Sequence, residues 1–125
     1  MRYLCLVYSV EDPAIVLSDN EEQALIDESL EYDEQLRKSG HFIIANALQP
    51  AESAAIVHVR SGRVSVTDGP FAETKEQVAG FILIEARDLN EAIQIAAQWP
   101  SARFGSIEVR PIAEELPKDR RYAAP

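Results

Sequence analysis

Cysteine and histidine are scarce in this sequence of 125 residues, which contains one cysteine and two histidines. Cys5 lies inside an apolar run, so no disulfide can form within the chain, and we expect a buried thiol in a reducing compartment. Because these ligands are few and no HExxH or CxxC spacing occurs, the sequence argues against a zinc or iron site. GxGxxG and the phosphate-binding lysine loop are also missing. We therefore predict no metal and no nucleotide cofactor.

Positive charge is also in short supply, with 12 lysines and arginines against 21 aspartates and glutamates, a net charge of -9 and a pI of about 4.6. Because nucleic-acid affinity depends on basic side chains that neutralise phosphates, this balance argues against nucleic-acid partners and against anionic membrane surfaces. No apolar run approaches the roughly 18 residues that span a bilayer, and the N-terminal apolar stretch is too short for a signal peptide. We expect a cytoplasmic protein.

Two short runs, residues 3–8 and 78–86, are apolar almost without interruption, which is typical of strands covered on both faces. A helix is predicted between Ser18 and Gly40, because Ser18 and Glu21 have the spacing of a capping box and basic residues precede the glycine. The core-facing stripe of this helix has helical spacing and consists of Leu25, Ser29, Tyr32 and Leu36.

A second helix is predicted to begin at Asp88, which has Glu91 three residues later, and to stop at Trp99 and Pro100. Its predicted inward side chains are Leu89, Ile93, Ala96 and Ala97. Two further strands are predicted over residues 42–45 and 106–110. The second alternates apolar with charged residues, which suits a sheet edge.

Residues 54–60 and 63–67 are predicted to form a hairpin, with Ser61-Gly62 as its two-residue loop. Pairing Arg60 with Arg63 gives the hairpin one apolar and one polar face. The apolar face carries Val57, Val59, Val64 and Val66, and the polar face carries His58 and Ser65. Because the two arginines repel each other mildly, they need solvent, an acidic neighbour or an anion.

The predicted order is strand, helix, strand, hairpin, strand, helix, strand, which is an α+β, ferredoxin-like βαββαβ fold with an added β-hairpin. One domain is expected over residues 1–112, followed by a charged, proline-containing tail at 113–125. Both helices lie on one face of such a sheet, yet the two central strands are apolar on both faces. We therefore expect a second copy of the chain to cover the other face, giving a homodimer.

The connection before the second apolar strand reads Asp68-Gly69-Pro70-Phe71-Ala72-Glu73-Thr74-Lys75-Glu76. Pro70 fixes its own φ and Asp68 can bond its own backbone, so the turn is rigid. This nine-residue segment resembles the signature of the DGPF group of YCII-related proteins, and Ala47-Leu48-Gln49-Pro50 and Ser106-Ile107-Glu108-Val109-Arg110-Pro111 also match. The resemblance covers nearly all of residues 1–112.

The resemblance implies a ferredoxin-like subunit that forms a dimeric α/β barrel. The DGPF group is largely uncharacterised, and some of its genes are associated with extracytoplasmic-function sigma factors. The wider superfamily holds small isomerases, lyases and cofactor-free monooxygenases that act on phenolic or lactone-like compounds. Better-understood YCII-like relatives pair a histidine of the first helix with an aspartate, whereas this sequence has Ser29 at the equivalent position. That acid–base pair therefore does not transfer intact.

Asp68 is the main catalytic candidate, as a base or an orienting group, although an aspartate before glycine also closes ordinary turns. Tyr32 and His41 are the candidate proton donors. Their structural alternatives are a buried hydrogen bond for Tyr32 and capping of the helix C-terminus for His41. The candidate ligand-binding residues are Ser29, Gly69, Pro70 and Phe71.

Two functional hypotheses remain open on the sequence alone. The first is cofactor-free acid–base catalysis, such as isomerisation or elimination, on a small phenolic or carbonyl compound held in a pocket between helix and sheet. The second is a non-catalytic module for ligand sensing or protein interaction, connected by the family association to a sigma-factor pathway. In that case the acidic first helix would meet a basic partner, whereas its simpler explanation is a solvated face.

Overall fold

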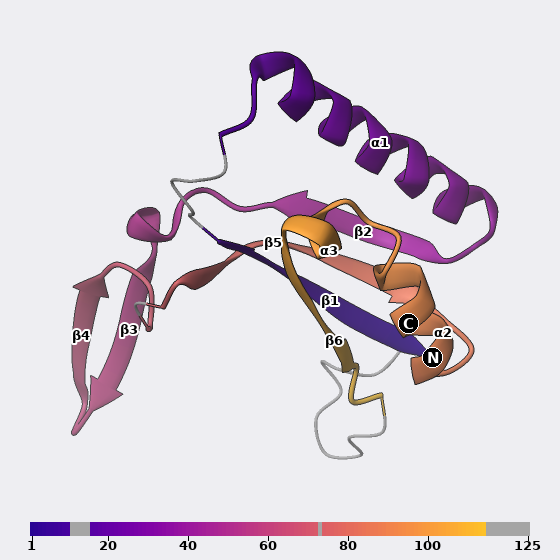
Figure 1. The fold of residues 1–125 in the computed structure, drawn as a ribbon. Coiled ribbons are helices and arrows are strands. Elements are labelled where there is room, and N and C mark those ends of the chain that lie inside the picture. Colours follow the sequence, from indigo (N-terminus) through magenta and orange to yellow (C-terminus); the bar gives the residue numbers. More distant parts are fainter. Residues whose placement is uncertain (11–15, 73, 115–125) are drawn as a thin grey trace.

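The computed structural model describes residues 1–10, 16–72 and 74–114. They form a four-stranded sheet with helices on one face, and a separate hairpin projects from one end (Figure 1). The sheet order is β2-β5-β1-β6, and every neighbouring pair is antiparallel. The strands are β1 (Arg2–Val10), β2 (Phe42–Ala47), β5 (Glu76–Glu85) and β6 (Gly105–Pro111). This order is that of a ferredoxin-like α+β fold, as predicted.

Helix α1 (Asp19–Lys38) begins at the predicted capping box. The Glu21 N–H donates to Ser18 Oγ at 3.2 Å, and the Ser18 N–H donates to Glu21 Oε1 at 3.3 Å. The helix ends before Gly40, which has a φ of 82°. Leu36 is its one buried side chain, and the rest of the predicted stripe (Leu25, Ser29, Tyr32) is half-buried. The predicted orientation of α1 is therefore confirmed.

The predicted inward face of the second helix, α2 (Leu89–Ala96), is wrong in most positions. Ala96 is buried, but Leu89 and Ile93 are 45% and 50% exposed and Ala97 is also exposed. The side chains that α2 buries are Ala92, Ile95 and Ala96. Apolar residues occur on several sides of this short helix, so contacts with the sheet and with α1 decide which side turns inward. The alanines let the helix backbone approach closely.

The Asp88 cap on α2 is confirmed, since its Oδ1 accepts from the Glu91 N–H at 2.8 Å. The helix ends at Ala96, three residues before the predicted stop. Trp99 and Pro100 are both buried in the turn that leads into a short helix, α3 (Ser101–Phe104). The sequence did not predict α3.

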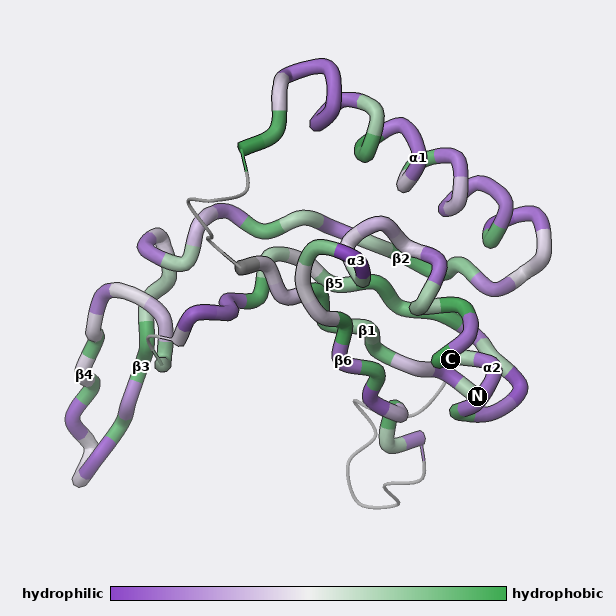
Figure 2. Tube along the Cα trace, in the orientation of Figure 1, coloured by the Kyte–Doolittle hydropathy of each residue, from purple (hydrophilic) through white to green (hydrophobic). Residues whose placement is uncertain are grey.

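The core lies between the helices and one face of the sheet, where Tyr3, Cys5 and Ile84 are the most deeply buried side chains. Burial raises the pKa of the Cys5 thiol to about 11. Figure 2 shows that apolar positions follow the central strands, whereas α1 is mostly hydrophilic. Alternate residues of the strands point to the other side, called here the open face, where Leu4 pairs with Leu83 and Leu6 with Phe81. No helix in the described residues covers the open face.

The projecting hairpin, called here the arm, consists of β3 (Ala55–Arg60) and β4 (Arg63–Asp68). Its register is as predicted, with Arg60 opposite Arg63 and His58 opposite Ser65. Ser61 and Gly62 have φ values of 52° and 73°, the paired positive φ angles that a two-residue hairpin loop of this hand requires. A short 3-10 turn, η1 (Ala51–Ser53), precedes the arm.

Within the described residues, no helix is long and apolar enough to cross a membrane.

Candidate functional site

A cavity of about 680 Å³ lies between the N-terminal half of α1, the ends of β1 and β5, and α3. It exists because α1 touches the core only through its C-terminal half. The helix rises away from the sheet toward its N-terminus (Figure 1). Its apolar lining includes Val7, Leu25, Ile26, Leu30, Ala79 and Phe104. This volume is called here the α1 cavity.

Gly105 also lines the α1 cavity and allows β6 to start close to β1. A Cβ at this position would lie 2.1 Å from the backbone oxygen of Tyr8, which is far inside contact distance. Any side chain at residue 105 would therefore push the strands apart at the wall of the cavity.

Ser29 is the predicted site residue that lines the α1 cavity. Its Oγ donates to the Leu25 carbonyl oxygen one turn earlier, at 3.0 Å, so the hydroxyl oxygen can still accept a hydrogen bond. The carboxylate of Glu22 and the hydroxyl residues Ser9 and Ser101 also line the cavity. The cavity thus offers a few polar groups on a mostly apolar wall.

Tyr32 lies one turn after Ser29 and contributes to a clamp between α1 and α2. Its hydroxyl donates to the Ile95 carbonyl oxygen at 2.7 Å, and its ring meets Trp99 edge to face at 5.5 Å. Burial, followed by the charge of Asp33, raises the pKa of the Tyr32 phenol to about 12. Its proton is therefore committed to a structural hydrogen bond.

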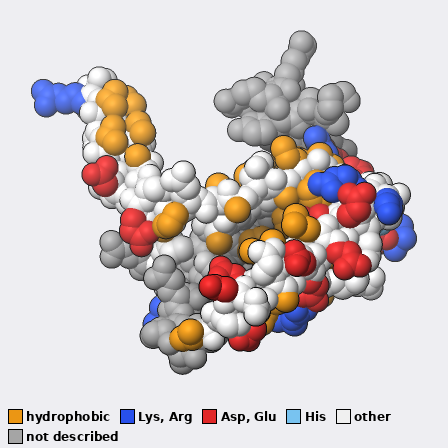
Figure 3. All heavy atoms as spheres, turned by 90° about the horizontal axis from the view of Figure 1, so that it is seen from above, with side chains coloured by type: hydrophobic (Ala, Val, Ile, Leu, Met, Phe, Trp, Pro, Cys, Tyr) orange, Lys and Arg blue, Asp and Glu red, His pale blue; other side chains and the backbone are white. Residues whose placement is uncertain are grey.

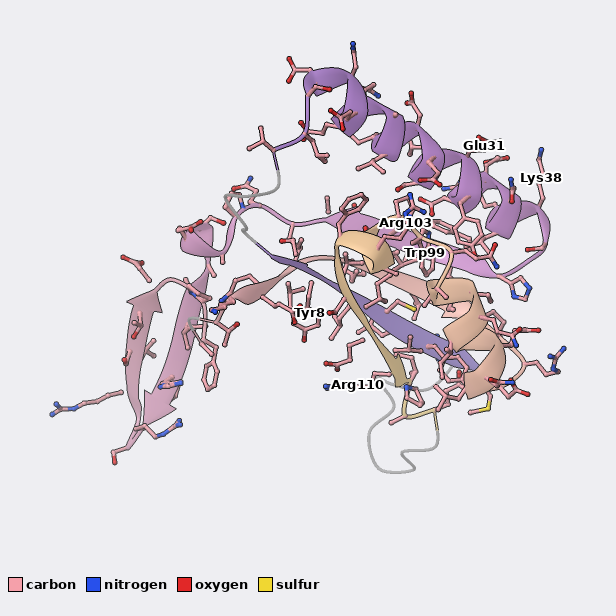
Figure 4. The ribbon with its side chains drawn as sticks, in the orientation of Figure 1. Tyr8, Glu31, Lys38, Trp99, Arg103 and Arg110 are labelled. Atoms are coloured by element: carbon pink, nitrogen blue, oxygen red, sulfur yellow. The ribbon has the colours of Figure 1, made fainter. Side chains whose placement is uncertain are left out.

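Asp33 completes the clamp, because its Oδ1 accepts from the Trp99 indole N–H at 2.9 Å. Figure 4 shows Trp99 between α1 and the sheet. Partial burial raises the pKa of Asp33, while the hydrogen bond from Trp99 and the charge of Arg37 oppose this rise.

His41 follows the C-terminus of α1, at the opposite end of that helix from the α1 cavity. Its Nδ1 is 2.8 Å from the Glu85 carbonyl oxygen and 3.9 Å from Glu91 Oε1. The backbone N–H of His41 donates to the Leu36 carbonyl oxygen at 2.8 Å. These contacts connect the C-terminal end of α1 to the end of β5 and to α2.

The predicted loop residues lie at the base of the arm. Asp68 is the last residue of β4 and is exposed, and within the described residues its carboxylate accepts no hydrogen bond. Gly69 has a φ of 95°, and its N–H donates to the Ala54 carbonyl oxygen at 2.7 Å. Pro70 is half-buried, whereas Phe71 is 81% exposed. A single chain therefore does not bring these residues, Tyr32 or His41 together with Ser29 around the α1 cavity.

A second hollow of about 570 Å³, absent from the predictions, lies on β1 and β6 beside the end of the signature segment. The Tyr8 hydroxyl donates to Glu108 Oε1 at 3.3 Å, and the Ser106 hydroxyl donates to Glu76 Oε1 at 3.0 Å. Burial and then Glu108 raise the pKa of the Tyr8 phenol. Figure 4 labels Tyr8, which lines both the hollow and the α1 cavity.

Tyr8 and Glu108 are 100 residues apart in the sequence, and only the pairing of β1 with β6 brings them together. The single available signal was the position of Glu108 on the polar side of a predicted edge strand. Within the described residues, no group of three or more His, Cys, Asp or Glu side chains is arranged to hold a metal ion.

Comparison with known proteins places this chain in a family. The YCII-related domain matches residues 1–115. An uncharacterised protein of Rhizobium meliloti (strain 1021) is 35% identical over 115 residues, which cover 90% of this chain and 93% of the relative. The domain match extends across the sheet, the helices, the arm and the signature loop. The chain therefore belongs to the family of YCII-related proteins.

Proposed function

We propose that this chain binds a small organic molecule with a largely apolar body in the α1 cavity. The cavity itself is the observation that carries the proposal: its volume of about 680 Å³ suits a small-molecule site. Its mostly apolar wall with a few polar groups is also typical of such sites. Ser29 and Glu22 are the groups that would orient the ligand.

The polar groups favour a neutral ligand with hydroxyl or carbonyl groups. Glu22 accepts hydrogen bonds from a phenol, and the serine hydroxyls can donate to a carbonyl oxygen. An anionic ligand is disfavoured by Glu22 and by the net charge of -9. A small phenolic or carbonyl compound therefore fits this site best.

Cofactor-free acid–base chemistry is the second part of the proposal. Tyr8 and Glu108 are a phenol and a carboxylate in hydrogen-bond contact at the second hollow, on the same side of the sheet as Leu6, and they would exchange a proton with a ligand that enters this hollow. Asp68 keeps an exposed carboxylate at the base of the arm. It would reach a bound ligand only if a second copy of the chain brought it there.

The chain is further proposed to be a homodimer whose copies pack through their open faces. Support comes from the central strands, where Leu4, Leu6, Phe81 and Leu83 form an apolar row on the side away from the helices. Covering such a row removes apolar surface from water.

A second candidate function is a protein-interaction module, possible because α1 presents many exposed carboxylates. They include Glu21, Glu22, Asp27, Glu28, Glu31 and Glu34. This surface suits a basic partner, and the association of the DGPF group with sigma factors makes a sigma factor the first partner to test. Binding of such a partner would weaken steeply with salt.

The ligand proposal is tested by titrating the protein with the neutral fluorescent probe N-phenyl-1-naphthylamine. We expect saturable binding that a phenolic competitor reduces. Ser29→Phe places a phenyl group in the cavity where the ligand would lie and should weaken binding at least tenfold. Glu31→Phe adds the same phenyl group to the outer side of α1 (Figure 4) and should leave binding unchanged. Equal binding by the Ser29→Phe variant and the wild type would refute the proposed site.

A further inference from the structure

We propose that the arm clasps a second copy of this chain through its valine face. The inference rests on the proposed homodimer and assigns a specific role within it to residues 55–68. It also gives the signature loop, which lies at the base of the arm, a position next to the second copy.

The arm exposes an apolar surface that the chain leaves uncovered. Figure 3 shows apolar side chains gathered along one face of the projecting hairpin, with basic side chains at its tip. The exposures of Val57, Val59, Val64 and Val66 are 61%, 55%, 69% and 62%. Four adjacent β-branched side chains that are all more than half exposed form a patch of the kind that marks an interface.

The arm also receives little support from its own chain. Among the described elements, β3 and β4 make extensive contacts only with each other. An isolated two-stranded hairpin is marginally stable in water, so a cover over the valine face would supply what the hairpin lacks. The polar face, with His58 and Ser65, needs no such cover.

The direction of the arm favours a second copy as this cover. The arm leaves the sheet at the end remote from α2 and extends away from α1 (Figure 1). A copy packed against the open face would therefore lie alongside the arm. Ile44, which pairs with Leu83 on the open face, is 47% exposed and extends the apolar surface onto β2.

Charge gives an independent reason for the same occupant. Arg60 and Arg63 face each other at the arm tip, and in the described residues neither has a carboxylate within ion-pair distance. Each chain carries a net charge of -9, and α1 presents most of its acids to solvent. By register the two arginines lie on the polar face, so the valine face carries neither of these charges, and the basic tip offsets part of the repulsion between two acidic chains.

The clasp would also complete the environment of the signature loop. Asp68 and Phe71 are both exposed at the base of the arm, and a single chain gives the carboxylate of Asp68 no partner among the described residues. In the clasped dimer these two side chains face the second copy, where Phe71 is covered and Asp68 can meet a polar group.

The test measures the dimer dissociation constant of full-length variants by light scattering over a range of concentrations. Val59→Thr with Val64→Thr keeps the β-branched shape but replaces two methyl groups by hydroxyls, and should weaken the dimer at least tenfold. His58→Thr with Ser65→Thr changes the opposite face of the same hairpin and should alter the constant less than twofold. Both variants should keep the circular dichroism spectrum of the wild type, because neither touches the sheet core.

Each outcome bears on a different claim. A valine-face variant that folds and dimerises like the wild type would overturn the clasp while leaving the homodimer through the open face intact. A wild-type protein that stays monomeric at micromolar concentration would overturn both. Weakening by the polar-face variant to the same extent would also contradict the clasp, since only the valine face is assigned to the contact. Ligand binding in the α1 cavity is measured separately and would survive any of these results.

Discussion

The C-terminal half of α1 packs against the core of the protein, whereas the N-terminal half stands away from the sheet. The C-terminal half is clamped: Leu36 is buried, Tyr32 bonds α2, and Asp33 accepts a hydrogen bond from Trp99. The N-terminal half stands off the sheet and leaves a cavity of about 680 Å³. One helix can thus anchor the fold at one end and leave room for a ligand at the other. Substitutions in the clamped C-terminal half should therefore lower the free energy of unfolding. Substitutions in the N-terminal half, called here the lifted half, should alter ligand binding.

The largest effect is expected for Trp99→Ala, which deletes a side chain that is 2% exposed and removes the partner of both Tyr32 and Asp33. The free energy of unfolding should fall by about 3–5 kcal/mol. Phe104→Ala at the α1 cavity is the matched change, and because Phe104 is 42% exposed its cost should be smaller, about 1–2 kcal/mol. Urea denaturation followed by circular dichroism measures both. Similar losses for the two variants would remove the distinction between the halves.

A smaller effect is expected for Tyr32→Phe, which keeps the ring against Trp99 but removes the hydrogen bond to the Ile95 carbonyl oxygen. The cost should be about 0.5–1.5 kcal/mol, toward the lower end because the Gln98 N–H also donates to that oxygen. Ser29→Ala, one turn away in the lifted half, should change the free energy of unfolding by less than about 0.5 kcal/mol. A loss at Ser29 as large as that at Tyr32 would show that the clamp extends to the cavity.

The smallest effect is a pH dependence of stability that comes from Asp33. Because partial burial raises the pKa of Asp33 in the folded state above its ordinary value of 3.8, the folded protein holds that proton more tightly than the unfolded chain. The contribution of Asp33 to stability should therefore fall as pH rises from below 3.8 through the raised pKa. Asp33→Asn keeps an acceptor for Trp99 and should abolish this fall.

Glu114 provides a control of opposite sign. Arg2 lowers the pKa of Glu114 in the folded state below its ordinary value of 4.5, so its stabilisation is present above that value and is lost as pH falls through the lowered pKa. Thermal unfolding of Asp33→Asn and Glu114→Gln between pH 3 and 7 should give difference curves of opposite slope. Curves of the same sign would show that one of the two assignments is wrong.

The sequence predicted those parts of the fold that local chemistry determines. The register of the arm follows from a two-residue loop and a strict alternation of valines with polar residues, and the structure reproduces it pair by pair. The start of α1 follows from a capping box, whose two hydrogen bonds are both formed. The inward stripe of α1 follows from a helix long enough for its period to be unambiguous.

The parts that the sequence missed depend on contacts between distant residues. Ile95 rather than Ile93 turns inward on α2, on the side where the alanines are buried and the Tyr32 hydroxyl bonds the Ile95 backbone carbonyl oxygen. The candidate site likewise contains one residue that the sequence predicted and one that it missed. Ser29 was placed on the inward face of α1 by its spacing, whereas Tyr8 was missed because its partner Glu108 comes from the other end of the chain.

The most direct test of the difference between the halves of α1 is a nuclear magnetic resonance titration with N-phenyl-1-naphthylamine, read at each backbone amide. We expect the largest shifts in residues 22–30, and at Ala79 and Gly105 across the cavity, with little change in residues 32–38 of the same helix. Shifts confined to the arm, or spread evenly along α1, would contradict the proposal that the lifted half of this helix forms a ligand site.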